Sequence, residues 1–180
     1  MIDGKYPPIE QLLPHRSPMI LIDRLVWTNG VETICEVTIG PHSMFIQAVG
    51  VPAFVGIEYM AQTVAAHGGY QSFLEGQPMV VGLLLGTRRL ETPCQFFELG
   101  QTLRIAATHI WGQHELMRFR CAITHTVSNI RLQQAELNVF RPKALQSYLE
   151  EIGHDDTRTH HRWQSGDRAG HRLSPGGPRS

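Results

Sequence analysis

Residues 51–62 read Val-Pro-Ala-Phe-Val-Gly-Ile-Glu-Tyr-Met-Ala-Gln, an apolar stretch of mostly small residues that carries a single carboxylate, Glu58. Pro52 suits the start of a helix, because its φ angle is already helical and its missing N–H would have no partner in the first turn. Helical spacing puts Phe54, Val55, Ala61, Gln62 and Ala65 on the face of Glu58. A charge on such a face costs free energy unless it is paired, so Glu58 is either a chemical group or part of a buried hydrogen-bond network.

The whole chain has the size and charge of one ordinary globular domain. It contains 180 residues, with 16 basic and 16 acidic side chains that give no net charge. Zero net charge argues against a protein that binds nucleic acid by neutralising phosphates. The N-terminus lacks an apolar core typical of a secretion signal, and no apolar run is long enough to span a bilayer. The three cysteines, Cys35, Cys94 and Cys121, are too widely spaced for a metal site and are expected to be reduced core thiols. We therefore expect a soluble cytoplasmic protein.

Extended segments flank the expected helix on both sides. Residues 19–28 and 31–39 predict two strands joined at Asn29-Gly30, a strong hairpin signal. Gly68 and Gly69 are natural helix stops, so the helix is expected to end there. Four further strands are expected at residues 79–87, 102–111, 116–127 and 131–140.

Two of these later strands alternate in a way that predicts one covered face. The residues expected on the covered face are Leu103, Ile105, Ala107, His109 and Trp111 in one strand, and Met117, Phe119, Cys121 and Ile123 in the next. The expected fold class is α+β, an antiparallel sheet of about five or six strands wrapped around one long central helix. Small helix residues would let the sheet approach closely, namely Gly56, Ala61, Ala65, Ala66 and Gly68.

The domain is expected to span residues 1–150, because the apolar pattern stops beyond Leu149. Residues 153–180 hold only three apolar side chains, Trp163, Ala169 and Leu173. Such a segment cannot bury enough surface to offset the entropy lost on ordering. Residues 151–180 are therefore expected to be a disordered tail, whose histidines are solvated rather than bound to metal.

Two motifs resemble one known family. Residues 52–62 resemble the central-helix signature of the hotdog-fold β-hydroxyacyl-acyl-carrier-protein dehydratases, and residues 12–24, Leu-Leu-Pro-His-Arg-Ser-Pro-Met-Ile-Leu-Ile-Asp-Arg, resemble the first motif of that family. The two motifs occur in the family's order. Within the family the chain looks most like the dehydratase-like proteins of bacterial aryl polyene pathways, and the resemblance implies a hotdog fold.

The resemblance also implies a reaction. In such a dehydratase, the substrate enters on the phosphopantetheine arm of an acyl carrier protein, at the interface of a homo- or heterodimer, and no cofactor or metal is needed. A histidine takes the C2 proton of the 3-hydroxyacyl thioester, and a carboxylic acid on the opposing central helix protonates the departing hydroxyl. Glu58 matches that acid and Gln62 the positioning glutamine of the helix. Free N–H groups near Gly50 and Ala53, at the helix start, are expected to bind the enolate oxygen.

The expected base has no counterpart in this sequence. The family carries its histidine in a His-Phe-Pro-Gly segment just before the helix, whereas residues 45–52 here contain none. The nearest alternative is His42, in the same loop. His15-Arg16 and Asp23-Arg24 are interpreted as structural pairs near the first strand. Arg88 and Arg89 are candidates to meet an acidic carrier protein or the pantetheine phosphate, although a solvated strand end explains them equally well.

Three functions are consistent with an acid that lacks a matching base. The first is a subunit of a 3-hydroxyacyl-carrier-protein dehydratase, in fatty-acid or aryl polyene biosynthesis, whose histidine comes from a partner chain. The second is an acyl thioesterase, in which an ionised Glu58 would activate water. The third is a catalytically silent subunit that completes or stabilises another protein. The sequence favours a blend of the first and the third.

Overall fold

The computed structural model of the protein describes residues 6–87, 89–113 and 115–142. The chain divides into two compact units, Met1–Lys143 and Ala144–Ser180. The second unit, and with it the expected disordered tail at residues 151–180, lies outside the described residues. The description below concerns the first unit.

One long helix, α1 (Gly56–Leu74), forms where the sequence predicts it, after a 3₁₀ turn, η2 (Ala53–Val55), that follows Pro52. The predicted end at Gly68-Gly69 is wrong, because the helix continues through both glycines to Leu74. A Cβ on Gly69 would lie 2.0 Å from the carbonyl oxygen of Leu12. Gly69 therefore marks the place where the N-terminal segment touches the helix rather than the place where the helix ends.

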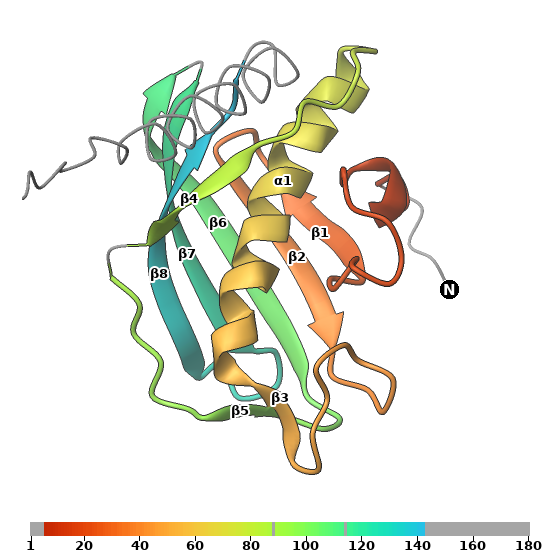
Figure 1. The fold of residues 1–180 in the computed structure, drawn as a ribbon, viewed down its shortest axis with the longest axis vertical. Helices are drawn as coiled ribbons and strands as arrows, with labels where there is room; N and C mark the ends of the chain where they lie inside the picture. Colours follow the sequence, from red (N-terminus) through yellow and green to blue (C-terminus); the bar gives the residue numbers. More distant parts are fainter. Residues whose placement is uncertain (1–5, 88, 114, 143–180) are drawn as a thin grey trace, which may run out of the picture. The chain divides into compact units, whose positions relative to one another are not determined.

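Six strands make one antiparallel sheet in the order β1-β2-β6-β7-β8-β4, and α1 crosses one face of it (Figure 1). The strands are β1 (Arg24–Thr28), β2 (Glu32–Thr38), β4 (Leu83–Thr87), β6 (Thr102–Gln113), β7 (Leu116–His125) and β8 (Arg131–Phe140). This arrangement confirms the predicted hotdog-type α+β fold. Two short strands that the sequence did not predict, β3 (Gly50–Pro52) and β5 (Phe96–Glu98), pair with each other. Strand β3 directly precedes the helical segment in the sequence, and β5 follows β4.

The hairpin between β1 and β2 turns at Asn29-Gly30, as predicted. Gly30 has a φ of 84°, a conformation that glycine adopts without strain. The side-chain oxygen of Asn29 accepts hydrogen bonds from the backbone N–H groups of Val31 (2.9 Å) and Glu32 (2.8 Å). The turn is therefore fixed by the two residues that signalled it.

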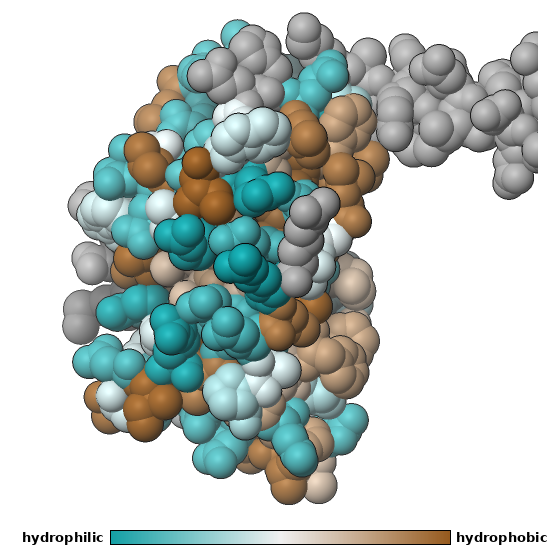
Figure 2. All heavy atoms as spheres, turned by 90° about the vertical axis from the view of Figure 1, so that its left-hand side faces the viewer, coloured by the Kyte–Doolittle hydropathy of each residue, from teal (hydrophilic) through white to brown (hydrophobic). Residues whose placement is uncertain are grey.

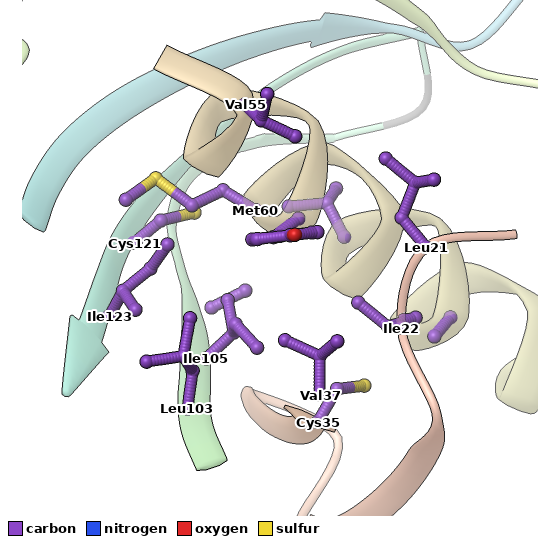
Figure 3. Close-up of a cluster of buried hydrophobic side chains, with 14 of the residues drawn as sticks. Leu21, Ile22, Cys35, Val37, Val55, Met60, Leu103, Ile105, Cys121 and Ile123 are labelled. Carbon is purple, nitrogen blue, oxygen red and sulfur yellow. The ribbon is translucent and has the colours of Figure 1, made fainter. Parts of the chain in front are cut away.

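The hydrophobic core lies between α1 and the covered face of the sheet. Figure 3 shows Val55 and Met60 from the helical segment lying over strand side chains that include Ile105 and Ile123. Leu103, Ile105, Ala107, Cys121 and Ile123 are fully buried, as the alternation predicts. Trp111 is a failed prediction, since its side chain is 59 % exposed. The pairing of β6 with β7 shifts register between His109 and Trp111, and such a bulge moves the following side chain to the other face.

The opposite face of the sheet carries polar side chains. Arg118 on β7 donates a hydrogen bond to Asn138 on β8 (3.0 Å), and Arg120 lies 3.9 Å from Glu136. In Figure 2, which views the side of the molecule where β7 and β8 lie, hydrophilic side chains gather in the middle. Only the other face of the sheet is therefore packed against the helix.

The three cysteines are free thiols, as expected, and Cys35 and Cys121 are buried. Burial raises the pKa of both buried thiols to about 12, which keeps them protonated and unreactive. Among the described residues, no helix is long and apolar enough to cross a membrane.

A charged cluster ties the first three strands of the sheet together. Glu36 on β2 accepts hydrogen bonds from Arg24 on β1 (2.7 Å) and from Arg104 on β6 (3.0 Å). Burial pushes the pKa of Glu36 up, but the hydrogen bonds and charges of the two arginines outweigh burial, so this pKa lies below its usual 4.5. The stabilisation is therefore present above the ordinary pKa and is lost as the pH falls through the lower pKa of the folded state.

We expect Glu36→Gln to lower the free energy of unfolding at pH 7 by about 1–3 kcal/mol, because two guanidinium groups lose a charged acceptor. Urea titrations of both proteins across acidic pH measure this difference. The gap between wild type and variant should narrow below pH 4.5. A gap that stays constant down to strongly acidic pH would contradict the assignment.

Gly69 and Gly68 offer a matched pair of substitutions on one helix. Gly69→Ala should destabilise the protein by about 1–3 kcal/mol, because the new Cβ meets the backbone of Leu12. Gly68→Ala should be neutral or stabilising by up to about 1 kcal/mol, since its nearest neighbour would be 3.9 Å away and alanine favours helix. Thermal unfolding of both variants measures the contrast, and equal effects would show that the N-terminal segment does not press on the helix.

Candidate functional site

Glu58 stands in the first turn of α1, on the side of the helix that the sheet does not cover. Its side chain is 36 % exposed, and Phe54, one turn earlier, is 69 % exposed. Two neighbours on the other side of the helix, Tyr59 and Met60, are buried in the core. The helix therefore fixes the Glu58 backbone firmly while it presents the carboxylate at the surface of this subunit.

The buried amide of Gln62 orients the Glu58 carboxylate. Its Oε1 accepts the backbone N–H of Leu21 (2.8 Å), and its Nε2 donates to the backbone carbonyl of Met19 (2.8 Å) and to Glu58 Oε1 (2.9 Å). Because the Leu21 N–H can only donate, it settles which end of the amide is oxygen. Gln62 thus joins the segment before β1 to the helix and aims its N–H at Glu58, one turn away.

A histidine also lies beside Glu58, and it is not the one that the loop suggested. The Nε2 atom of His15 is 3.6 Å from Glu58 Oε1, while its Nδ1 atom is buried without a hydrogen-bond partner among the described residues. Interpreting His15 as merely structural missed this contact. The available signal was its position in the first family motif, a few residues before the Met19–Leu21 stretch that Gln62 binds.

The segment that carries His15 is held against the helix. Leu12 and Leu13 are fully buried, and the carbonyl of Leu12 touches Gly69. The Nη1 atom of Arg16 turns back and donates to the carbonyl of His15 (2.9 Å). The structural interpretation is correct for Arg16, and the packing keeps its neighbour His15 in place.

His42 does not join Glu58. It is an exposed residue on the loop after β2, and it lines a hollow of about 430 Å³ together with Asp23 and Tyr59. Glu58 does not line this hollow, and no contact between the two side chains is found in the described part of the chain. Among the described histidines, the one found in contact with Glu58 is His15, which comes from a segment distant in sequence.

The backbone N–H groups expected to bind an enolate oxygen are already engaged. The Gly50 N–H donates to the carbonyl of Gln47 (3.2 Å), and the Ala53 N–H donates to the carbonyl of Gln95 (2.9 Å). The first bond closes an isolated bridge between Gln47 and Gly50, and the second directly follows the short β3–β5 pairing, which the sequence did not predict. The premise that these two groups are free is therefore wrong in this structure.

The remaining predicted polar residues fall into two groups. Arg88 lies outside the described residues, and Arg89 is exposed after β4, so their carrier-protein role stays a prediction. Asp23 and Arg24 serve the sheet, as expected. The Asp23 carboxylate accepts the Thr38 N–H (2.8 Å), and its pKa is raised because burial outweighs that bond.

Three of the small helix residues that were expected to let the sheet approach closely border a pocket instead. Ala61, Ala65 and Gly68 border a cavity of about 140 Å³ whose far wall includes Leu84 and Val139. Gly56 is the exception, because a Cβ there would lie 1.9 Å from the side-chain oxygen of Gln133 on β8. The pocket is mainly apolar, and it lies along α1 in the C-terminal direction from Glu58.

This geometry supplies one positioned acid and an adjacent apolar pocket. The described residues contain no group of three or more histidine, cysteine or carboxylate side chains arranged to hold a metal ion. A carboxylate that is held by a hydrogen bond and partly exposed can give or take a proton, and its exposed edge is accessible to a substrate or to a second protein.

Comparisons with known proteins agree with this picture. The family model described as ApeP-like, the ApeP dehydratase, matches residues 7–150. The dehydratase heterocomplex ApeI:P from Xenorhabdus doucetiae contains a chain that is 22 % identical, with a TM-score of 0.75 over 82 % of this chain and 99 % of that one. A comparison with curated proteins finds no match.

More distant structures share only the fold. A hypothetical thioesterase protein from Streptococcus pneumoniae is 8 % identical, with a TM-score of 0.53 over 66 % of this chain and 84 % of that one. The Escherichia coli PaaI protein is also 8 % identical, with a TM-score of 0.52 over 65 % and 81 %. Hotdog proteins with different chemistry therefore share this architecture.

Replacing Gln62 should damage the site and the fold together. In Gln62→Ala the Leu21 N–H and the Met19 carbonyl lose their partner inside the protein, so the free energy of unfolding should fall by about 2–4 kcal/mol. Gln71→Ala, on the same helix but only half-buried, is the control and should stay within about 0.5 kcal/mol of wild type. Equal losses in the two variants, measured by urea unfolding, would contradict the bridging role of Gln62.

Proposed function

Because the chain belongs to the ApeP-like dehydratase family, we propose that it is one subunit of a 3-hydroxyacyl-[acyl-carrier-protein] dehydratase of aryl polyene biosynthesis, with Glu58 as the proton donor. The observation that carries this proposal is the Glu58 carboxylate, held by Gln62 at the uncovered face of the central helix. A hydro-lyase reaction needs an acid there, because hydroxide is a poor leaving group unless it is protonated.

The reaction divides into two proton movements. A base removes a proton from C2 of the 3-hydroxyacyl thioester, and the electron pair forms the C2–C3 double bond as the C3–O bond breaks. Protonated Glu58 gives its proton to the departing oxygen, so that water and an unsaturated thioester are the products. The proton taken from C2 ends on the base, and its later return to Glu58 or to solvent restores the site.

The base comes from a second hotdog chain in this proposal. Within the described part of this chain, the histidine beside Glu58 touches the same carboxylate and does not stand across from it, as a base for C2 must. The exposed Phe54 ring lies one turn from Glu58 on the same helix face, which suits coverage by another subunit. The family's structural relative from Xenorhabdus doucetiae is described as a heterocomplex, which supports a mixed dimer here.

The substrate would reach the site as a carrier-bound thioester. The apolar pocket beside Ala61 and Ala65 suits an acyl chain that extends from Glu58 along the helix. Arg88 and Arg89 are the proposed contacts for the carrier protein or for the phosphate of its pantetheine arm. This proposal requires no metal or cofactor, and it places the protein in the cytoplasm, where carrier-bound intermediates are made.

Substitution of Glu58 tests the proposal. Dehydration of a 3-hydroxyacyl-carrier protein by this chain together with its hotdog partner should fall by about 10²–10⁴-fold in Glu58→Gln, because an acid is replaced by an amide that cannot release a proton. His42→Ala is the matched control and should stay close to wild type, since His42 is exposed away from Glu58. Mass spectrometry of the carrier protein measures the loss of water directly.

Other outcomes point to the competing functions. Full activity in Glu58→Gln would make this chain a structural partner of another enzyme. Loss of activity in His42→Ala alone would show that this chain carries its own base. Rapid hydrolysis of acyl-coenzyme A that is abolished by Glu58→Gln would identify a thioesterase, in which Glu58 activates water in its ionised form.

A further inference from the structure

Two side-chain nitrogens, one from Gln62 and one from His15, lie near the same oxygen atom of the Glu58 carboxylate. Gln62 Nε2 lies 2.9 Å from Oε1, and His15 Nε2 lies 3.6 Å from the same atom. The first distance is a hydrogen bond; the second is longer than one and lies within the range of a charge-dipole contact. The two partners come from different parts of the fold, one turn along α1 and the segment before β1.

The Gln62 donor cannot exchange places with its own oxygen. The Leu21 N–H binds the amide oxygen (2.8 Å), and the Met19 carbonyl accepts from the amide nitrogen (2.8 Å). If the amide were rotated by half a turn, its NH₂ group would face the Leu21 N–H, and its oxygen would face the Met19 carbonyl and the Glu58 carboxylate. Each of these contacts sets donor against donor or acceptor against acceptor in a buried environment. Glu58 Oε1 therefore always meets an N–H from Gln62.

The tautomer of His15 follows from the surroundings of its other nitrogen, Nδ1. The Nδ1 atom is buried, and no described group accepts or donates a hydrogen bond there. A buried N–H without an acceptor is among the rarest arrangements in proteins, whereas an acceptor without a donor is tolerated more often. A ring with a single proton therefore carries it on Nε2, directed at Glu58.

We propose that Gln62, through a hydrogen bond, and His15, through a longer contact, both direct an N–H at Glu58 Oε1, which leaves Oε2 as the oxygen that carries the transferred proton. A proton on Oε1 would point at two N–H groups, while a proton on Oε2 meets neither. His15 is thus a positioning residue and not the base that attacks C2. This inference rests on the proposed function of Glu58 as a proton donor.

Two amide substitutions of His15 test whether its Nε2–H positions Glu58 or whether the side chain only fills space. The amide nitrogen of His15→Gln reaches about as far as Nε2 of the histidine, whereas that of His15→Asn reaches only about as far as Nδ1. His15→Asn should lower the kcat for dehydration of 3-hydroxybutyryl-pantetheine by on the order of tenfold, with little change in KM, while His15→Gln stays within about twofold of wild type. Equal losses in both variants, or no loss in either, would overturn the proposal.

The kinetics are measured on the full chain with its hotdog partner, and a double-mutant cycle completes the test. In a Glu58→Gln background, His15→Asn should add no further loss, because its effect acts through the acid. A further tenfold loss in that background would show that His15 acts elsewhere, and would overturn the assignment. Thermal unfolding of each variant shows whether it is folded.

A spectroscopic readout needs neither substrate nor partner. ¹⁵N NMR of the imidazole side chains in the full-length protein, with the His15 signals assigned by their loss in His15→Gln, should show the Nε2–H tautomer at neutral pH. An Nδ1–H tautomer, which leaves no proton on the nitrogen that faces Glu58, would overturn the proposal even if Glu58 proves to be the acid. If Glu58→Gln keeps full activity, the proposed function fails, while the tautomer still decides whether His15 donates to Glu58.

Discussion

The site depends on one buried amide, because Gln62 satisfies three separate groups at once. Two belong to the backbone of the segment before β1, and the third is the Glu58 carboxylate. A buried amide with every hydrogen bond made has a single orientation, and a carboxylate bonded to it inherits that orientation. The position of the acid is therefore a consequence of how the N-terminal segment docks on the helix, not of the helix alone.

This dependence explains why the helix carries a glycine at position 69. Gly69 lets the backbone of Leu12 reach the helix, and that approach places His15 and Leu21 beside Glu58 and Gln62. The helix loses some intrinsic stability at Gly69, and the packing of the Leu12 backbone offsets the loss. The same arrangement leaves one helix face uncovered, and the partly exposed Glu58 carboxylate lies on it.

Local signals were sufficient for most of the fold and for the place of Glu58 in the first turn of the helix. Asn29-Gly30 and the alternation in β6 and β7 predict the strands because their causes lie within a few residues. The failures share a different cause. Trp111, the end of α1, His15 and the N–H of Ala53 are each decided by a bulge or by a partner far away in the chain, such as Leu12 for Gly69 and Gln95 for Ala53. Periodicity carries no information about such contacts, so the sequence located the helix and Glu58 but not the contact between His15 and the Glu58 carboxylate.

The central claim is that Glu58 protonates the leaving group, and a change of leaving group tests it most directly. Chloride leaves without a proton, so elimination from a 3-chloroacyl-pantetheine needs the base but not the acid. The account predicts that Glu58→Gln, assayed with its hotdog partner, loses most of its activity toward the 3-hydroxyacyl thioester and eliminates chloride at nearly the wild-type rate. An equal loss of rate with both substrates would contradict it, and would show that Glu58 serves the site in another way.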